Sequence, residues 1–234
     1  YLGADLIFVD IDLSTYSIDL EKIEEKITSK TKAIIPVHYA GLALDMKKIV
    51  HIAKQYNLKI IEDAAHALPS TCDSTLVGNN NTEATVFSFY ANKTMNTGEG
   101  GMILTKNPKI ADRVKVMRLH GIDRNSFDRY QSDKPKWYYE VIAPGFKYNM
   151  TDLASSVGIH QLKKIKDLRE KREKIAQVYN SEMVELPPVL PPQPKFGDIH
   201  SWHLYSIRVG DDTKWKRDEF IEEMCNNAMG CSVD

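Results

Sequence analysis

The most constraining feature of this sequence is a regular alternation of short apolar runs and helical patterns over its first hundred residues. The apolar runs are Leu6–Val9, Ala33–Val37 and Leu58–Ile61. Between them, Asp19–Ile27 and Asp45–Tyr56 repeat apolar residues at spacings of three and four, which places those residues on one helical face. A strand–helix–strand–helix–strand order is typical of a parallel sheet with helical crossovers. We therefore predict an α/β fold.

The following hundred residues extend this pattern. Two more strands are expected at Ala84–Phe89 and Met102–Thr105, and a helix at Pro108–Leu119. The segment 121–145 is polar and aromatic without a period, and so long a loop is usually functional or mobile. A long helix is expected over Thr151–Met183, with a buried side formed by Leu153, Val157, Leu162, Ile165 and Leu168. Its basic stretch, 163–174, is interpreted as a solvated face rather than a nucleic-acid surface.

A proline-rich stretch indicates the domain boundary. Prolines at 187, 188, 191, 192 and 194 form a stiff connector, which we place at 186–199. Residues 1–185 then form a large domain. Residues 200–234 begin a smaller α/β unit, with a strand expected at Trp202–Val209 and a helix at Lys214–Met229. The chain starts without a methionine and ends on a strand-like segment, so we expect it to be part of a longer protein.

Composition excludes several classes of function. The 31 basic and 32 acidic residues nearly cancel, so no global field attracts nucleic acid or an anionic membrane. No apolar run approaches the roughly 18 residues of a membrane span. The three cysteines have no CxxC spacing, which argues against a disulfide framework and favours a reducing cytoplasm.

Polar residues gather where the expected strands end, which is the edge at which open parallel sheets bind ligands. Asp63 and His66 follow one strand, and Tyr90 to Lys93 follow the strand that ends Ser88-Phe89. Each has an ordinary alternative, because Asp63 could cap a turn and His66 could be an interior histidine. A lysine held near the interior of a sheet should have a lowered pKa and suits Schiff-base formation, although a solvated surface lysine remains an alternative.

Two other patterns give weaker evidence of a binding site. The glycines of the run 97–101 precede a strand rather than a helix, so a tight turn is favoured over a phosphate loop. His200 and His203 have HxxH spacing but no nearby set of carboxylates, and we predict no metal site.

Several segments together resemble the DegT/DnrJ/StrS sugar aminotransferases. Seven such segments occur in the same order along the chain: 31–38, 62–67, 87–93, 97–101, 118–121, 144–152 and 202–204. The resemblance runs from about Gly3 to the last residue. The sequences of segments 39–41 and 146–149 are most similar to those of the branch that makes UDP-4-amino-4-deoxy-L-arabinose, followed by the UDP-amino-sugar enzymes of flagellin glycan pathways.

The resemblance implies a type I pyridoxal-phosphate fold, with a mainly parallel seven-stranded-type sheet and a smaller C-terminal α/β domain that is incomplete here. It assigns Lys93 as the catalytic Schiff-base lysine and Asp63 as the carboxylate facing the pyridine nitrogen. It places His66 against the cofactor ring and Ser88 at the cofactor phosphate. Asn149 is implied to reach the phosphate of the neighbouring subunit in a homodimer.

The implied reaction moves an amino group from L-glutamate, which leaves as 2-oxoglutarate, to the 4-keto group of a UDP-linked sugar. Such a product would feed surface polysaccharide, lipid A or protein glycosylation. Two alternatives stay open: a pyridoxal-phosphate dehydratase of deoxysugars, in which His replaces the lysine, and a non-catalytic fragment. The loop 122–143, which we expect to face the sugar, contains no readable specificity code.

Overall fold

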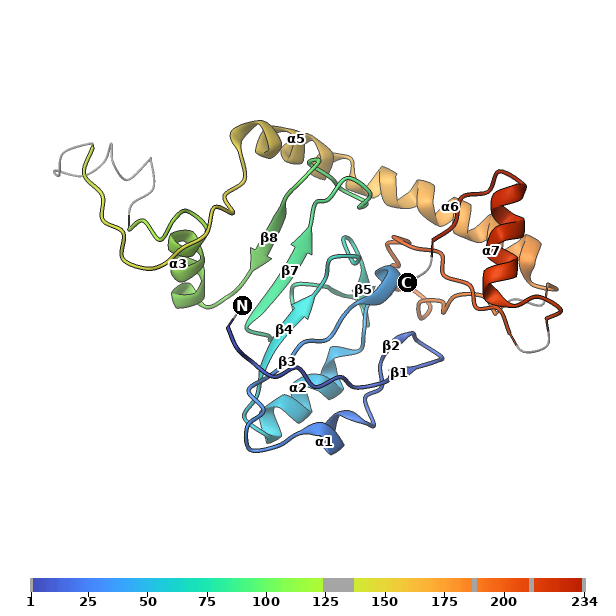
Figure 1. The fold of residues 1–234 in the computed structure, drawn as a ribbon, viewed down its shortest axis with the longest axis horizontal. Coiled ribbons are helices and arrows are strands. Elements are labelled where there is room, and N and C mark those ends of the chain that lie inside the picture. Colours follow the sequence, from blue (N-terminus) through green and yellow to red (C-terminus); the bar gives the residue numbers. More distant parts are fainter. Residues whose placement is uncertain (1, 124–136, 187–188, 211–212, 233–234) are drawn as a thin grey trace.

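The computed structural model describes residues 2–123, 137–186, 189–210 and 213–232. Its centre is a four-stranded sheet in the order β3-β4-β7-β8, formed by Ala33–Ile34, Lys59–Asp63, Ala84–Ser88 and Gly101–Leu104 (Figure 1). The first three strands are parallel, and β8 runs antiparallel to β7. The predicted α/β class with a mainly parallel sheet is confirmed.

The remaining elements are short strands and helices around this sheet. Two small hairpins lie beside the sheet. Helices α5 and α6 follow each other almost end to end above the upper ends of β7 and β8 in the view of Figure 1. Their bounds are β1 Ile11–Asp12, β2 Ser17–Ile18, α1 Ile23–Lys26, η1 Tyr39–Gly41, α2 Met46–Gln55, β5 Thr71–Cys72, β6 Thr75–Leu76, α3 Pro108–Met117, α5 Asp152–Lys163, α6 Ile165–Met183 and α7 Arg217–Asn226.

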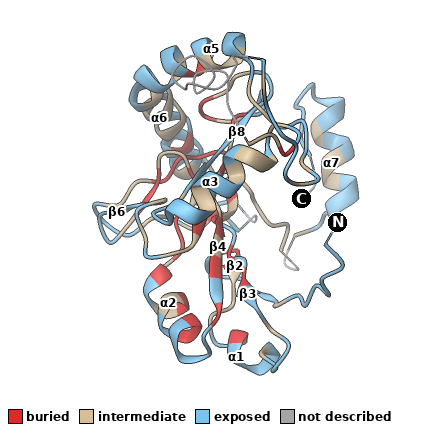
Figure 2. Cartoon of the chain, turned by 90° about the vertical axis from the view of Figure 1, so that its left-hand side faces the viewer, coloured by how far each residue is buried: buried red, intermediate tan, exposed pale blue. Residues whose placement is uncertain are grey.

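The main hydrophobic core lies between α2 and the sheet. The helix begins where the Asp45 carboxylate accepts a hydrogen bond of 3.0 Å from the amide of Lys47, which satisfies one of the free donors of the first turn. Ile49 and Ile52 on its inner face are almost fully buried against Ile60 of β4 and its neighbours. Figure 2 shows the buried residues concentrated in α2 and β4. This packing fixes the position of the carboxyl end of β4.

The expected strand Leu6–Val9 is wrong. Residues 3–10 form no strand, and Leu6, Ile7 and Phe8 are exposed. An apolar run becomes a strand only where a neighbouring strand offers its hydrogen-bonding edge, and no described segment pairs with this one. The helix expected over Asp19–Ile27 is reduced to the single turn of α1.

The single long helix expected over Thr151–Met183 is interrupted. Lys164, with a ψ of 0°, ends α5 and precedes α6. The expected buried side is wrong for α5, where Leu153, Val157 and Leu162 are exposed. Ile165 does pack against the protein interior, at the start of α6. Periodicity identified an apolar face without showing whether the described chain covers it.

The last part of the chain contains less regular structure than expected. The segment 202–209 is not a strand, because its one ladder contact among the described residues is a bridge between Val189 and Arg208. The chain at its start is instead joined to η1, because the amides of Ser201 and His203 donate to the carbonyls of Gly41 and Ala40. The domain boundary at 186–199 stays a prediction. The helix expected at Lys214–Met229 is present as the shorter α7.

Candidate active site

The site lies at the carboxyl edge of the sheet, where β4 and β7 end side by side. The parallel register pairs Asp63, the last residue of β4, with Val86 of β7, so Asp63 and Ser88 finish at the same edge. The Asp63 carboxylate accepts a hydrogen bond of 2.9 Å from the amide of Ala65. Ser88 Oγ accepts one of 3.3 Å from the amide of Tyr90. Both side chains are half-buried.

Lys93 lies in the connection between β7 and β8, residues 89–100. This connection is closed at its base by two backbone hydrogen bonds, from the amide of Phe89 to Gly100 and from that of Thr97 to Phe89. The amide of Lys93 also donates to the carbonyl of Tyr90, at 3.0 Å. The antiparallel turn therefore returns the lysine to the edge of the sheet. Beneath it, Phe87, Phe89 and Met95 form a second buried cluster.

A buried polar network supports β4 directly below the site. Glu62 is fully buried, and its carboxylate accepts hydrogen bonds from His38 Nε2 (3.0 Å), Asn80 (2.7 Å), Thr82 (2.6 Å) and Thr85 (2.9 Å). Burial by itself raises the pKa of Glu62, but the hydrogen bonds from His38, Thr82 and Asn80 outweigh it, and the pKa lies below its ordinary value. Glu62 is thus a structural anion beside the candidate site.

The tautomer of His38 follows from the same network. Its Nδ1 accepts a hydrogen bond of 3.0 Å from the amide of Leu44, so this nitrogen carries no proton. Nε2 is therefore the nitrogen that donates to Glu62. The pair links the chain after β3 to β4 and fixes the strand that carries Asp63.

His66 is held between two aromatic rings. Its Nδ1 accepts a hydrogen bond of 3.3 Å from the amide of Ala40. The ring centroid lies 4.3 Å from that of His203 and 6.1 Å from that of Tyr39. The structure therefore gives the His66 ring two aromatic neighbours. The contact of His66 with a cofactor ring stays a prediction.

Sequence reasoning did not assign His203 to the site. The structure places its Nε2 3.3 Å from Nζ of Lys93, although 110 positions separate the two residues. Burial, followed by electrostatic interactions with His66, Lys93 and Arg172, lowers the pKa of His203 to about 3. The available signals were the HxxH spacing and the segment 202–204, but neither indicated contact with Lys93.

Arg172 of α6 is the second missed residue. Its guanidinium donates to the carbonyls of Trp202 (3.1 Å), His203 (3.3 Å) and Asn92 (3.2 Å). Burial lowers its pKa below the usual value. The interpretation of 163–174 as a solvated face is therefore wrong for Arg172, which joins the loop of Lys93 to the loop of His203.

Asn149 lies apart from this cluster in the contacts of the described chain. It precedes α5, and its side-chain oxygen accepts a hydrogen bond from the Lys147 ammonium. The following residue, Met150, packs against the cluster beneath Lys93. The reach of Asn149 to a neighbouring subunit stays a prediction, because one chain alone cannot display it. Most of the loop 122–143, namely 124–136, lies outside the described residues.

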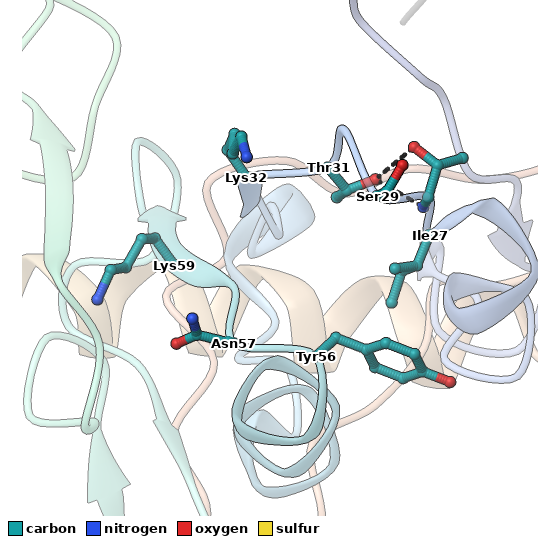
Figure 3. A pocket seen from close by; sticks show the side chains of 8 residues that line it. Ile27, Ser29, Thr31, Lys32, Tyr56, Asn57 and Lys59 are labelled. Atoms are coloured by element: carbon teal, nitrogen blue, oxygen red, sulfur yellow. Dashed lines mark hydrogen bonds between the residues drawn. The ribbon is translucent and has the colours of Figure 1, made fainter.

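A cavity among the described residues lies elsewhere. About 660 Å³ in volume, it opens at the amino ends of β3 and β4, the edge of the sheet opposite Lys93 (Figure 3). It is lined by Ile27, Thr28, Ser29, Thr31, Lys32, Tyr56, Asn57 and Lys59. We place the active site at the carboxyl edge, because the candidate amine, carboxylate and imidazole groups converge there and the cavity is lined by none of them.

The groups at the carboxyl edge fit a pyridoxal phosphate. They comprise an amine at Lys93, a carboxylate at Asp63, a hydroxyl at Ser88 and the paired rings of His66 and His203. Moreover, Nδ1 of His203 is buried and has no hydrogen-bond partner within the described part of the chain. A buried polar atom without a partner is costly, and a bound ligand would relieve this cost.

An α/β sheet with a lysine and a carboxylate at its carboxyl edge fits the class of pyridoxal-phosphate enzymes of fold type I. The chain belongs to the DegT/DnrJ/EryC1/StrS aminotransferase family, whose model matches residues 1–233. An uncharacterized protein of Methanocaldococcus jannaschii is 49% identical over 228 residues, 97% of this chain and 58% of that protein. SpsC of Bacillus subtilis, a spore coat polysaccharide biosynthesis protein, is 41% identical over 90% of this chain and 54% of its own length.

Solved structures agree with this assignment. PseC of Helicobacter pylori, an aminotransferase involved in the biosynthesis of pseudoaminic acid, has a TM-score of 0.86 and 29% identity, covering 96% of this chain and 58% of PseC. Spr1654 of Streptococcus pneumoniae, in its PMP form, has the same TM-score and identity, covering 97% and 61%. Its PLP form is also similar. The predicted type I fold is confirmed, and so is pyridoxal phosphate as the cofactor of this family.

The chain spans a little over half the length of the curated relatives it matches. Among the described helices, none has both the length and the apolar character required to cross a membrane.

Proposed function

We propose that the whole protein of which this chain is part is a pyridoxal-phosphate aminotransferase acting on a UDP-linked 4-keto sugar, with L-glutamate as the amino donor. The observation that carries the proposal is the placement of Lys93 at the carboxyl edge of the sheet, where Asp63 also ends. Family membership and the similarity to PseC and SpsC support a sugar substrate. Within the family we favour the branch that makes 4-amino-4-deoxy-arabinose, acting in the cytoplasm on precursors of surface glycans.

The residues of this chain have separate tasks in that reaction. Asp63 would hold the ring nitrogen of the cofactor protonated, and Ser88 would bind the phosphate. His66 would pack against the ring. Bound pyridoxal phosphate would supply an electron sink. Lys93 would anchor the cofactor and, as a free amine, would move a proton at the donor carbon.

Two further groups complete the proposed site. Asn149 would bind the cofactor phosphate of a partner subunit, so the proposal includes a homodimer. Tyr90 stands where many members of the family have His, and its exposed ring lies three residues before Lys93. The dehydratase alternative is disfavoured by Lys93 itself, since those members carry His at this position. The remaining alternative is a non-catalytic member of the family.

Cofactor attachment tests the proposal directly. The chain is incubated with pyridoxal phosphate, reduced with borohydride, digested and analysed by mass spectrometry. We expect the adduct on Lys93 and its loss in Lys93→Ala. Lys115→Ala, which removes an exposed lysine on α3, serves as the matched control and should keep the adduct. No adduct in the whole protein, or an adduct retained in Lys93→Ala, would reject the assignment of Lys93.

Activity is then measured on the whole protein. With L-glutamate alone, a single turnover should release 2-oxoglutarate, and with a UDP-4-keto sugar as acceptor the double-reciprocal lines should be parallel. Intersecting lines would contradict the two half-reactions. Release of 2-oxoglutarate together with failure to aminate any UDP-4-keto sugar would retain the aminotransferase and reject the sugar.

A further inference from the structure

We propose that His203 is a positioning residue for Lys93: its Nε2 accepts a hydrogen bond from the Lys93 ammonium and holds the amine at the carboxyl edge of the sheet. The importance of this contact for catalysis rests on the proposed function, because that function assigns Lys93 to the cofactor. The contact itself belongs to the cofactor-free chain and is measured there.

The chemistry of the ammonium group sets the direction of the hydrogen bond. Nζ of Lys93 and Nε2 of His203 lie 3.3 Å apart. A lysine ammonium has three donors and no acceptor, so the imidazole nitrogen facing it must be the acceptor. The proton of a neutral His203 then resides on Nδ1. This is the nitrogen that is buried without a hydrogen-bond partner among the described residues.

The surroundings keep His203 in the accepting form. Its side chain is buried, and the groups that act on it are the Lys93 ammonium, the Arg172 guanidinium and the His66 ring. Burial and these three neighbours disfavour a second proton on the imidazole. In its neutral form the ring offers a lone pair to Lys93.

The loop that carries His203 is held by contacts from three directions. The Arg172 guanidinium donates to the carbonyls of Trp202 and His203. The His203 amide donates to the Ala40 carbonyl at 2.9 Å, and the ring lies against His66. Trp202 has a φ of +50°, a conformation that a bulky residue adopts only when its surroundings impose it.

These contacts restrict the conformations of the Lys93 side chain. A lysine side chain has four rotatable carbon–carbon bonds and would otherwise sample many positions. Arg172 also donates to the Asn92 carbonyl, the residue immediately before Lys93, so one guanidinium fixes both partners of the contact. The amine is thereby oriented before any cofactor arrives, as an enzyme with a preorganised reacting group requires.

The tautomer of His203 tests the proposal. In the ¹⁵N-labelled chain without cofactor, two-bond ¹H–¹⁵N correlations distinguish Nδ1–H from Nε2–H, and His203→Gln identifies the signal. We expect the neutral Nδ1–H form from pH 6 to 8, and a shift towards Nε2–H in Lys93→Met. Lys115→Met, on the exposed side of α3, should leave the signal unchanged. An Nε2–H form in the unmodified chain, or an unchanged tautomer in Lys93→Met, overturns the proposal.

A second measurement separates positioning from mere packing. The rate of covalent pyridoxal-phosphate attachment is compared in His203→Leu and His203→Gln, with folding checked by circular dichroism. We expect attachment to slow at least tenfold in His203→Leu and to recover in His203→Gln, whose amide oxygen accepts a hydrogen bond. Equal rates in the two variants overturn the proposal. Failure of attachment in the unmodified protein would reject the proposed function while leaving the tautomer result to decide this inference.

Discussion

Replacing Gly41 with alanine should disturb the contact between η1 and the loop that carries His203. Gly41 ends the short helix η1 and has a φ of +102°. A Cβ built on it would overlap Ser201 Oγ and would lie 3.0 Å from the His66 carbonyl oxygen and 3.1 Å from the Trp202 amide. The position therefore requires glycine both for its backbone conformation and for the close approach of two chain segments.

The expected cost has two parts. Placing an alanine at positive φ costs about 1–2 kcal/mol. Relief of the overlap displaces Ser201, whose Oγ donates to the His66 carbonyl at 2.5 Å and whose amide donates to the Gly41 carbonyl at 3.2 Å. Each lost hydrogen bond costs about 1 kcal/mol. The free energy of unfolding should therefore fall by about 3–4 kcal/mol.

Urea unfolding followed by circular dichroism measures this loss. Gly197→Ala is the matched control, since Gly197 has a φ of +87° but an added Cβ there meets no atom within 4 Å. The control should lose only the backbone part, about 1–2 kcal/mol. Removing the hydroxyl first, with Ser201→Ala, should reduce the cost of Gly41→Ala. Equal losses at Gly41 and Gly197 would refute the reasoning, because the overlap would then contribute nothing.

Two further outcomes are expected from the carboxylates. The Glu62 pKa is lower in the folded state, so the contribution of Glu62 to stability is complete above the unfolded pKa of about 4.3 and is lost as the pH falls through the folded pKa. Urea unfolding from pH 7 to pH 3 should show this loss of stability, and Glu62→Gln should make the free energy of unfolding depend less on pH. Asp198 accepts hydrogen bonds from Thr71 Oγ1 and from the amides of Asp73 and Ser74, so Asp198→Ala should cost about 1–3 kcal/mol, and Asp198→Asn, which keeps one acceptor oxygen, should cost less. An Asn variant as unstable as the Ala variant would contradict this account.

The successful predictions rest on local chemistry. The runs Ala33–Val37, Leu58–Ile61 and Ala84–Phe89 became β3, β4 and β7, since each is flanked by turn residues and each pairs with a neighbour in the same sheet. Asp45–Tyr56 became α2 because its apolar stripe meets that sheet. Where the sheet offered no neighbour, as at Leu6–Val9, the same kind of apolar run formed no strand.

The residues of the candidate site also divide into those that local sequence patterns could group and those that they could not. Asp63 and Lys93 lie where strands end, and parallel strands bring their carboxyl ends to one edge, so sequence reasoning could group these residues, whereas Ser88 was assigned by resemblance. His66 lies three residues after Asp63 and joins them for the same reason. Asn149 was assigned by resemblance alone, and the contacts of a single chain do not bring it to the other four.

What this sequence determined by itself was the class of the fold and the edge of the sheet at which the candidate residues gather. These follow from periodicity and from residues adjacent along the chain, whereas the assignment of Lys93 came from the family resemblance. Only the tertiary structure placed His203 against Lys93. It also showed that Arg172, which the sequence suggested to be a surface charge, donates hydrogen bonds to both loops. Such contacts join residues 31 to 110 positions apart, and no local pattern encodes them, because they arise where separately packed segments meet.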